Sequence, residues 1–322
     1  MQKDIVILTG VLGSGASYIA EYLVNNHPGV EIHGWARWHS TGSNTNIAHI
    51  TDKIYMHEVD LMDLSAVIEA LKKIKPTKIL HLASTANVRT CFDTPLSIYQ
   101  NNVMSTANLF QAVKMVCPDS IIQLCSTSEV YGNPQEYPMT EDHKSVPVNP
   151  YAASKASQEA LAYGWGQSWG LKIIITRAFC YINPRRKDLF ATSFAYQIAK
   201  IEAGLQDKLK HGNLDSIRTI MDVRDMAEAY WIGCEKCEYL TPYNIGGKFA
   251  ISVGDFLEIL KDHAKVPIIC EQDKHLLRPK DVTRQVPDIS KFYEATKWER
   301  KYTIEESVQW LLDEMRKEVK KL

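Results

Sequence analysis

Four residues in two short stretches carry the side chains that an alcohol oxidation needs. Tyr151 and Lys155 stand in "PYAASKAS" at the spacing Y-x-x-x-K, so on a helix they share one face. A neighbouring ammonium favours a phenolate and is expected to lower the pKa of Tyr151, which can then take the proton of an alcohol. Thr127, in "STSEVYG", offers a hydroxyl for the same substrate oxygen, and Glu129 follows it.

The carboxylate of Glu129 goes beyond what a simple oxidation needs. The apolar run at residues 120–125 predicts a buried strand of a parallel sheet. Ligands of open α/β sheets bind beyond the carboxyl ends of such strands, so Thr127, Ser128 and Glu129 are expected at a ligand site. The carboxylate therefore raises the question of what chemistry needs both a hydroxyl and an acid at this position.

A glycine-rich loop, "TGVLGSGAS", joins an N-terminal apolar strand to an amphipathic helix. Its spacing is G-x-x-G-x-x-[G/A], which permits a tight turn and a close approach of the backbone to a pyrophosphate at a helix N-terminus. The loop therefore predicts a dinucleotide site. The residues expected to contact the cofactor are Gly10, Gly13, Ser14, Gly15 and Ala16.

The end of the second strand helps to choose between the two nicotinamide dinucleotides. An acidic residue there would bind the ribose of NAD, whereas an arginine accommodates the 2′-phosphate of NADP. The sequence has Arg37 in "GWARWHS" and no acid, so NADP is favoured and NAD stays possible. Later strand ends are expected to flank the adenine (Asp60 and Leu61) and to line the middle of the cofactor (Ala83 and Ser84).

The elements that must position these residues alternate between strand and helix. Strands are predicted at residues 4–10, 30–37, 55–61, 78–84, 120–125 and 171–179, and helices at 17–26, 64–74, 104–116 and 154–170. This alternation predicts an α/β, Rossmann-like, doubly wound parallel sheet. Residues 1–178, with a returning segment near 217–240, are expected to form the cofactor domain, and residues 179–322 a smaller mixed lobe. That lobe holds a predicted helix at 192–203 and a final helix capped by Thr303.

Composition narrows the functional class. The formal net charge of −1 gives no general attraction for nucleic acid or an anionic membrane. No apolar window is long enough to cross a bilayer, and the N-terminal apolar stretch is too short for a signal peptide, so a cytoplasmic location is expected. The seven cysteines are scattered, as reduced thiols are, and the CxxC at Cys234 and Cys237 has no second pair, so no metal site is predicted.

Taken together, these motifs resemble the extended short-chain dehydrogenase/reductases that act on nucleotide sugars. The resemblance is closest to the GDP-mannose 4,6-dehydratases and the GDP-4-keto-6-deoxymannose reductases, and it spans nearly the whole chain through "GSGASYIAEYL", "EIHGWAR", "STSEVYG", "NPYAASK", "NPRRK", "GNLDSIRT" and "LLRPKDV". It implies a GDP-sugar substrate, a homodimer or homotetramer, and a catalytic set of Thr127, Glu129, Tyr151 and Lys155. Tyr151 and Lys155 are also expected to contact the cofactor. The substrate-binding residues that it implies are Ser128, Cys180, Arg185, Arg186, Asn213, Arg218 and Arg278.

For a dehydratase of this kind the resemblance implies oxidation at C4 with Tyr151 as base, loss of water from C5–C6 with Glu129 as acid and base, and return of the hydride to C6. Residues 180–182 depart from the family, because the dehydratases carry Asn-His-Glu where this chain has Cys-Tyr-Ile. A reductase, C4 dehydrogenase or epimerase acting on a related GDP-hexose or GDP-heptose therefore stays open. A sensor or scaffold that binds NADP without catalysis is the alternative outside the enzymes.

Overall fold

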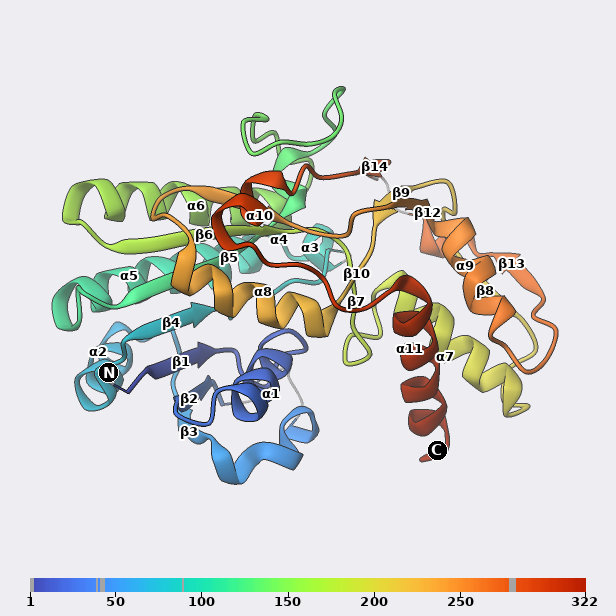
Figure 1. The fold of residues 1–322 in the computed structure, drawn as a ribbon, viewed down its shortest axis with the longest axis horizontal. Helices are drawn as coiled ribbons and strands as arrows, with labels where there is room; N and C mark the ends of the chain where they lie inside the picture. The colour runs from blue at the N-terminus through green and yellow to red at the C-terminus, as the bar shows by residue number, and fades with distance from the viewer. Residues whose placement is uncertain (1–2, 39, 41–43, 89, 278–281) are drawn as a thin grey trace.

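A parallel sheet organises the chain in the computed structural model, which describes residues 3–38, 40, 44–88, 90–277 and 282–322. Among these residues the sheet has seven strands in the order β11-β6-β5-β4-β1-β2-β3, and every neighbouring pair is parallel (Figure 1). The strands are β1 (Ile5–Thr9), β2 (Glu31–Ala36), β3 (Tyr55–Glu58), β4 (Lys78–His81), β5 (Ile121–Thr127), β6 (Lys172–Ala178) and β11 (Pro242–Ile245). The predicted Rossmann-like fold is confirmed.

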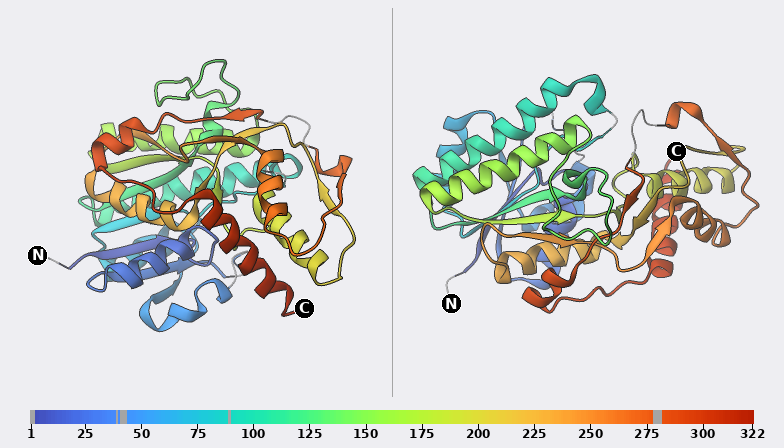
Figure 2. Two further views of the ribbon diagram at one scale, coloured as in Figure 1. Left: turned by 45° about the vertical axis from the view of Figure 1, so that its right-hand side comes forward. Right: turned by 90° about the horizontal axis from the view of Figure 1, so that it is seen from above.

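Helices cover both faces of this sheet, as the views in Figure 2 show. On one face α1 (Ala16–Asn26) packs against α8 (Val223–Lys236), and their apolar side chains share one buried cluster. On the other face α2 (Leu64–Ile74), α5 (Ser105–Val116) and α6 (Pro150–Trp169) bury a second cluster. Both faces of the strands are therefore apolar, which explains why the strands read as continuous hydrophobic runs rather than alternating ones.

Two element boundaries differ from the sequence prediction in ways that affect the site. The predicted helix at 154–170 begins four residues earlier, because Asn149 caps it and Pro150 takes the first helical position, where its missing N–H costs nothing. Strand β5 runs on to Thr127 instead of ending at Cys125. Tyr151 therefore lies in the first turn of α6, and Thr127 ends β5.

A second set of elements packs beside the carboxyl ends of the strands. Its helices α7 (Phe190–Glu202), α9 (Val253–Asp262) and α11 (Ile304–Val319) share a third apolar cluster. Its short strands are β7 (Tyr181–Ile182), β8 (Leu209–His211), β9 (Ile217–Thr219), β10 (Met221–Asp222), β12 (Ala250–Ser252), β13 (Cys270–Gln272) and β14 (Arg284–Gln285). Because α8 and β11 then return to the main sheet, the chain crosses between the two parts more than once. The predicted division at residue 178 stays a prediction.

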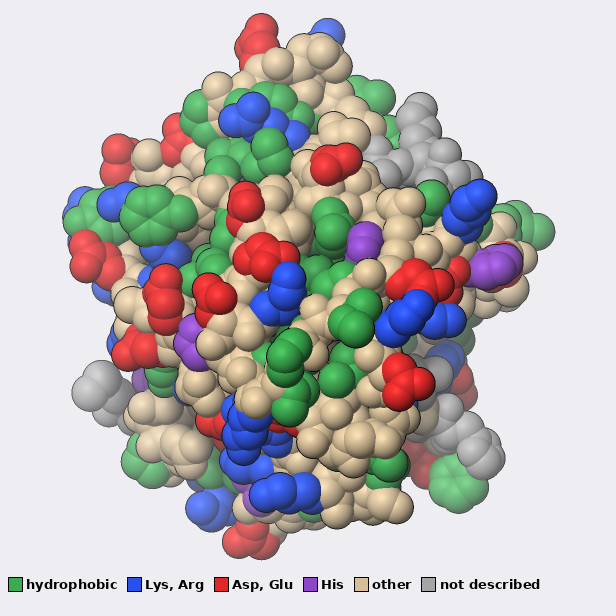
Figure 3. All heavy atoms as spheres, turned by 90° about the vertical axis from the view of Figure 1, so that its right-hand side faces the viewer, with side chains coloured by type: hydrophobic (Ala, Val, Ile, Leu, Met, Phe, Trp, Pro, Cys, Tyr) green, Lys and Arg blue, Asp and Glu red, His purple; other side chains and the backbone are tan. Residues whose placement is uncertain are grey.

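The remaining elements are short connections. The helices are α3 (Thr90–Asp93), α4 (Pro95–Tyr99) and α10 (Ser290–Thr296), and the single turns are η1 (Asn44–Asn46), η2 (Ala48–Lys53), η3 (Gln100–Met104), η4 (Ser128–Tyr131) and η5 (Lys274–Leu276). Acidic and basic side chains are interspersed over the coloured part of the face in Figure 3, which accords with the small net charge of −1. None of the helices in the described ranges is both long and apolar enough to cross a membrane.

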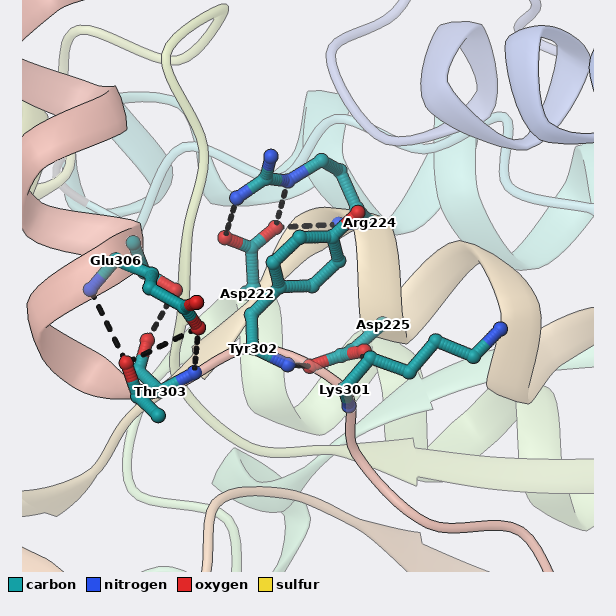
Figure 4. Close-up of polar contacts among 8 residues, drawn as sticks. Asp222, Arg224, Asp225, Lys301, Tyr302, Thr303 and Glu306 are labelled. Carbon is teal, nitrogen blue, oxygen red and sulfur yellow. Dashed lines mark hydrogen bonds and ion pairs between the residues drawn. The ribbon is translucent and has the colours of Figure 1, made fainter.

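An arginine clamp joins the two parts of the molecule (Figure 4). Arg224, in the first turn of α8, makes a bidentate ion pair with Asp222 at 2.9 and 2.7 Å. Its guanidinium lies 3.7 Å from the ring centroid of Tyr302 and 4.0 Å from that of Trp310, on the segment that leads into α11 and on α11 itself. The Asp222 side chain has no exposed surface, so its charge depends on this partner.

Removing the clamp is expected to destabilise the protein strongly. Arg224→Ala leaves the Asp222 carboxylate buried without its cation, which should lower the free energy of unfolding by about 3 kcal/mol. Arg224→Lys keeps the charge but loses the planar fork and the stacking, so it should recover only part of that loss. Urea unfolding measures both effects. The control is Lys72→Ala, which breaks an exposed ion pair with Glu69 and should change the free energy of unfolding only slightly. Equal stability of all three variants would contradict a clamp.

Candidate active site

A cleft of about 430 Å³ lies at the carboxyl ends of the sheet strands. Its walls come from the glycine loop, from the ends of β5 and β6, from α6, and from the second set of elements around α7 and β8–β9. This is the edge at which open α/β sheets bind ligands. The buried strand β5 ends at Thr127 and the turn η4 follows it directly. This continuation places Thr127, Ser128 and Glu129 in the cleft.

The four candidate catalytic residues all line this cleft. Thr127 ends β5, and its Oγ1 accepts a hydrogen bond from the Glu129 backbone N–H at 3.3 Å, which starts the turn η4. Tyr151 and Lys155 project from the first two turns of α6. Asn149, which caps α6, donates from Nδ2 to the Glu129 Oε2 at 2.7 Å. The hydroxyl, the carboxylate and the phenol therefore belong to one site.

The expected acidic phenol is not what the structure shows. Burial raises the pKa of Tyr151, and the positive charge of Arg186 is the largest effect that opposes this rise, with hydrogen bonding to Thr127 adding to the opposition. Lys155 instead donates from Nζ to the backbone carbonyl of Cys125 at 2.8 Å. The prediction that Lys155 makes the phenol acidic is therefore wrong for this arrangement, because desolvation by the surrounding protein outweighs the nearby charges.

Lys155 is itself strongly affected by burial. Burial lowers the pKa of Lys155 to about 8, and the smaller effects of Cys125 and Glu159 oppose that change. Glu159 lies one turn further along the same face of α6, so the helix presents Tyr151, Lys155 and Glu159 in a row. The site therefore holds an ammonium group whose charge is poised near neutral pH.

A buried ion pair under the cleft anchors α6 against β6, and the sequence analysis did not find it. Arg177 contacts Glu159 through two nitrogen atoms at 3.1 and 2.7 Å and donates to the Tyr131 hydroxyl at 2.9 Å. Ser126, which precedes Thr127, donates to the same Glu159 carboxylate. The only hint in the sequence is the spacing of Glu159, four residues after Lys155.

The glycine loop has the shape that a pyrophosphate site needs. Gly10 has φ +68°, and a Cβ there would lie 3.0 Å from the Cα of Ala83. A Cβ on Gly13 would lie 2.9 Å from the carbonyl oxygen of Gly10. The Ser84 hydroxyl beside this loop is buried and has no hydrogen-bond partner in the described part of the chain. A tight cradle with an unused hydroxyl fits a dinucleotide.

The sequence-predicted cofactor residues divide between two connected pockets. Gly10, Gly13, Ser14, Gly15 and Ala16 line the main cleft. A smaller pocket of about 90 Å³ adjoins it and shares Gly10 and Ser84 with it. That smaller pocket is lined by the other predicted residues, namely Arg37, Asp60, Leu61, Ala83 and Ser84. Arg37 lies at its edge and donates to Asn101 Oδ1 at 3.2 Å.

Most of the residues expected to bind substrate also line the main cleft. They are Ser128, Cys180, Arg186, Asn213 and Arg218. Arg218 lies on β9 and donates from Nη2 to the Val282 carbonyl. Arg278 lies outside the described residues. Among the cleft residues that the sequence analysis missed are Tyr181, Phe190, Phe194, Tyr230 and Gln285, which come from segments without a recognisable motif.

Arg185 is the exception among the predicted substrate residues. Its side chain turns to α1, where it donates to Ser17 Oγ at 3.0 Å and to Glu21 Oε2 at 2.6 Å. Its guanidinium lies 3.8 Å from the ring centroid of Tyr18. Arg185 is absent from the lining of its own chain's cleft, where Arg186 takes the place next to the catalytic residues. The carboxylate and the ring on α1 hold Arg185 outside this cleft, and its predicted role in substrate binding stays a prediction.

Comparison with known proteins agrees with this geometry. The family model described as GDP-mannose 4,6 dehydratase matches residues 7–311. The GDP-6-deoxy-D-mannose reductase of Pseudomonas aeruginosa is 30% identical over 82% of this chain and 88% of its own length. The GDP-mannose 4,6-dehydratase of Yersinia enterocolitica is 27% identical over 93% of this chain and 90% of its own length.

Solved structures show the same relationship. The structure of RMD from Pseudomonas aeruginosa complexed with NADPH superimposes with a TM-score of 0.83 at 26% identity, covering 98% of this chain and 99% of that one. The homologues are nucleotide-sugar dehydratases and reductases of the extended short-chain type, so the chain is an enzyme of that type. With a family match over almost its whole length, the chain belongs to the GDP-mannose 4,6-dehydratase family.

Proposed function

We propose that this enzyme is an NADP-dependent GDP-sugar 4,6-dehydratase, which converts a GDP-mannose-like hexose into its 4-keto-6-deoxy product. One observation carries this proposal. The carboxylate of Glu129 lines the same cleft as the Tyr151 phenol and the Thr127 hydroxyl, so a second acid/base group stands beside the oxidation site. Water elimination needs such a group, whereas oxidation alone does not.

The cofactor would be held by the two connected pockets. The glycine loop and the N-terminus of α1 suit the pyrophosphate, and Arg37 suits a 2′-phosphate, which supports NADP over NAD. One solved structure at 26% identity, that of RMD from Pseudomonas aeruginosa, is a complex with NADPH. When bound, NADP supplies a reversible hydride acceptor.

The first step removes two hydrogens from the alcohol at C4 of the sugar. Tyr151 takes the hydroxyl proton while the C4 hydrogen leaves as hydride, and the Thr127 hydroxyl steadies the same oxygen. The positive charge of Arg186 favours the phenolate form of Tyr151, which is the form that can accept this proton. Lys155 completes the site by fixing the end of β5 through its bond to the Cys125 carbonyl.

The second step uses the ketone made by the first. The ketone acidifies the hydrogen on C5, the Glu129 carboxylate removes it, and the C6 hydroxyl leaves as water with the proton that Tyr151 took from the C4 hydroxyl. Hydride then returns to C6, and Glu129 returns its proton to C5. Atoms balance with the loss of one water, and no net oxidation or reduction remains.

A net reductase is the second candidate, because the relative at 30% identity is a GDP-6-deoxy-D-mannose reductase and Cys180 replaces the asparagine of the dehydratases. The two functions differ in stoichiometry. A dehydratase incubated with GDP-sugars gives a product lighter by one water and no lasting change in nicotinamide absorbance. A reductase consumes one NADPH for each 4-keto substrate and gives a product heavier by two hydrogens.

Substituting Glu129 tests the elimination step directly. Glu129→Gln keeps the shape of the side chain but cannot accept a proton, so we expect turnover to fall about 10²–10³-fold. A single turnover should then show NADPH absorbance that rises and persists, because oxidation at C4 proceeds while elimination stalls. The control is Glu136→Gln, which changes the charge on the loop that follows the turn, away from the cleft lining. Full turnover by Glu129→Gln would rule out Glu129 as the base.

The assembly is expected to be a homodimer or homotetramer, as the family resemblance implies. Light scattering of the purified protein measures it independently of the reaction.

A further inference from the structure

Asn149 makes two contacts that join the two halves of the catalytic apparatus. Its side chain is nearly fully buried, with 8% of the residue exposed. The Oδ1 atom accepts a hydrogen bond from the Ala152 backbone N–H at 2.8 Å, and this contact caps α6. The Nδ2 atom donates to Glu129 Oε2 at 2.7 Å. One amide is thus shared between the helix of Tyr151 and the carboxylate of Glu129.

The hydrogen bond from Asn149 to Glu129 uses one carboxylate oxygen, Oε2, and does not involve Oε1. Among the residues that the structure describes, Asn149 alone makes a hydrogen bond with the Glu129 side chain. A primary amide can donate a hydrogen bond but cannot take up or release a proton near neutral pH, so its contact orients the carboxyl group without exchanging a proton with it. Glu129 is therefore oriented through one oxygen, and the second oxygen is left for the substrate hydrogen that the elimination removes.

The contact to α6 fixes the distance between the two bases. Tyr151 lies in the first turn of the helix that Asn149 caps, and Lys155 lies in the next. The turn η4, which carries Glu129, is fixed by its own backbone. Gly132, which ends this turn, has φ +67°, and a Cβ there would overlap the Val146 carbonyl oxygen. C4 and C5 are adjacent atoms, so a base for each must keep a fixed offset, and a shift of about 1 Å can cost about 10²-fold in rate.

We infer that Asn149 is a positioning residue for the elimination step, which holds the Glu129 side chain in a fixed orientation and at a fixed offset from Tyr151. The inference rests on the proposed dehydratase function for its kinetic consequence. It assigns no chemistry to Asn149 itself, because the amide exchanges no proton with the sugar. Its action is transmitted through Glu129, and the oxidation at C4 should not depend on it.

Asn149→Asp is the sharpest test. Aspartate caps helices as well as asparagine does, so α6 should stay intact. The amide donor, however, becomes a second carboxylate beside Glu129, which raises the pKa at which the pair loses its second proton and both groups become charged. In a single turnover at pH 7 we expect C4 oxidation within about 3-fold of the wild-type rate and elimination slower by about 100-fold. Transient NADPH absorbance and deuterium uptake at C5 from D₂O report the two steps separately.

Two further variants separate positioning from folding. Asn149→Ser keeps a capping oxygen but lacks the amide nitrogen, so elimination should slow without the upward shift in its pH dependence that Asn149→Asp produces. Thr303→Asp exchanges the cap of α11, far along the chain from the site, and should leave both steps unchanged. If Asn149→Asp slows both steps equally and melts at a lower temperature, the residue is only a helix cap and the inference is overturned.

The role of Asn149 can also be tested without the reaction, so that it is decided even if the proposed dehydratase function fails. If the wild-type enzyme releases no water, that function fails, and the titration of Glu129 then decides on Asn149. Carbon-13 NMR of protein labelled at glutamate, with Glu129→Gln to assign the signal, should show the Glu129 carboxyl titrating at least about one pH unit higher in Asn149→Asp. An unchanged titration would overturn the inference whatever the reaction.

Discussion

Replacing Lys155 with methionine is expected to inactivate the enzyme and yet make it more stable. Turnover should fall about 10³–10⁴-fold, because the end of β5 loses its anchor and the cleft loses a cation. Burial lowers the pKa of Lys155 to about 8 from an ordinary 10.5, so holding the charge at pH 7 costs the folded state about 3 kcal/mol. Methionine removes that cost but leaves the Cys125 carbonyl without its donor, which costs about 1 kcal/mol.

The net expectation is a gain of about 2 kcal/mol in the free energy of unfolding at pH 7. The sign follows from proton binding. Between pH 8 and 10.5 the unfolded chain binds the proton of this lysine and the folded chain does not, so the penalty on the wild-type protein shrinks as the pH rises through that window. The stability difference between variant and wild type should therefore narrow from pH 8 upward. Urea unfolding at pH 7 and pH 10 measures it.

Lys78 offers a matched control with the opposite sign. It is also a buried lysine on the sheet, but its Nζ lies 2.6 Å from Asp4 Oδ1 and 5.0 Å from the ring centroid of Trp231. Lys78→Met breaks an ion pair, so it should destabilise the protein and leave turnover unchanged. If Lys155→Met also destabilises the protein at pH 7, then burying the Lys155 ammonium does not cost the folded state the free energy that its lowered pKa indicates.

The features that sequence predicted correctly are those set by local periodicity. Continuous apolar runs and amphipathic helices alternate along the first half of the chain, and this pattern alone specifies a parallel sheet. The helix at 64–74 was predicted to the residue, because Asp63 caps it and its apolar face is regular. Thr127 and Glu129 could be placed at the cleft because they follow directly from a buried strand, whose end is the ligand-binding edge.

The features that sequence could not predict depend on contacts between distant residues. The pKa of Tyr151 is raised by burial, and burial is a property of the whole fold, whereas the Y-x-x-x-K spacing suggested only the local charge. Arg185 and Arg186 are adjacent in sequence, yet one turns to Glu21 and the other to the cleft. Asn149 and Glu129 are separated by twenty residues of loop and turn, so nothing in the spacing announced their contact.

A buried histidine on β4 contacts Thr9, which lines the smaller pocket. His81, on β4, lies between Thr9 Oγ1 and Thr106 Oγ1, each at 2.9 Å. Thr9 Oγ1 already accepts from the backbone N–H groups of Leu82 and Ala83, so its own proton must go to His81 Nδ1. The imidazole ring is therefore neutral, with its proton on Nε2. Nδ1 accepts the Thr9 hydroxyl proton, so protonating Nδ1 would break that hydrogen bond.

Acid is therefore expected to destabilise the protein through this one ring. Burial, with the charge of Lys155, lowers the pKa of His81 to about 3, whereas in the unfolded chain the imidazole has its ordinary pKa of 6.5. The stability contributed by the neutral ring is complete above pH 6.5 and is lost as the pH falls from there toward 3, at about 1.4 kcal/mol per pH unit. At pH 5 the loss from this residue should reach about 2 kcal/mol relative to pH 7.

His81→Gln isolates that contribution, because its amide cannot be protonated in this range. The variant should be less stable than the wild type at pH 7, where the threonine contacts are imperfectly replaced, but it should lose less stability between pH 7 and pH 5. Carboxylates that titrate in the same window act equally in both proteins and cancel in the comparison. Parallel slopes for the two proteins would show that His81 does not set the acid limit.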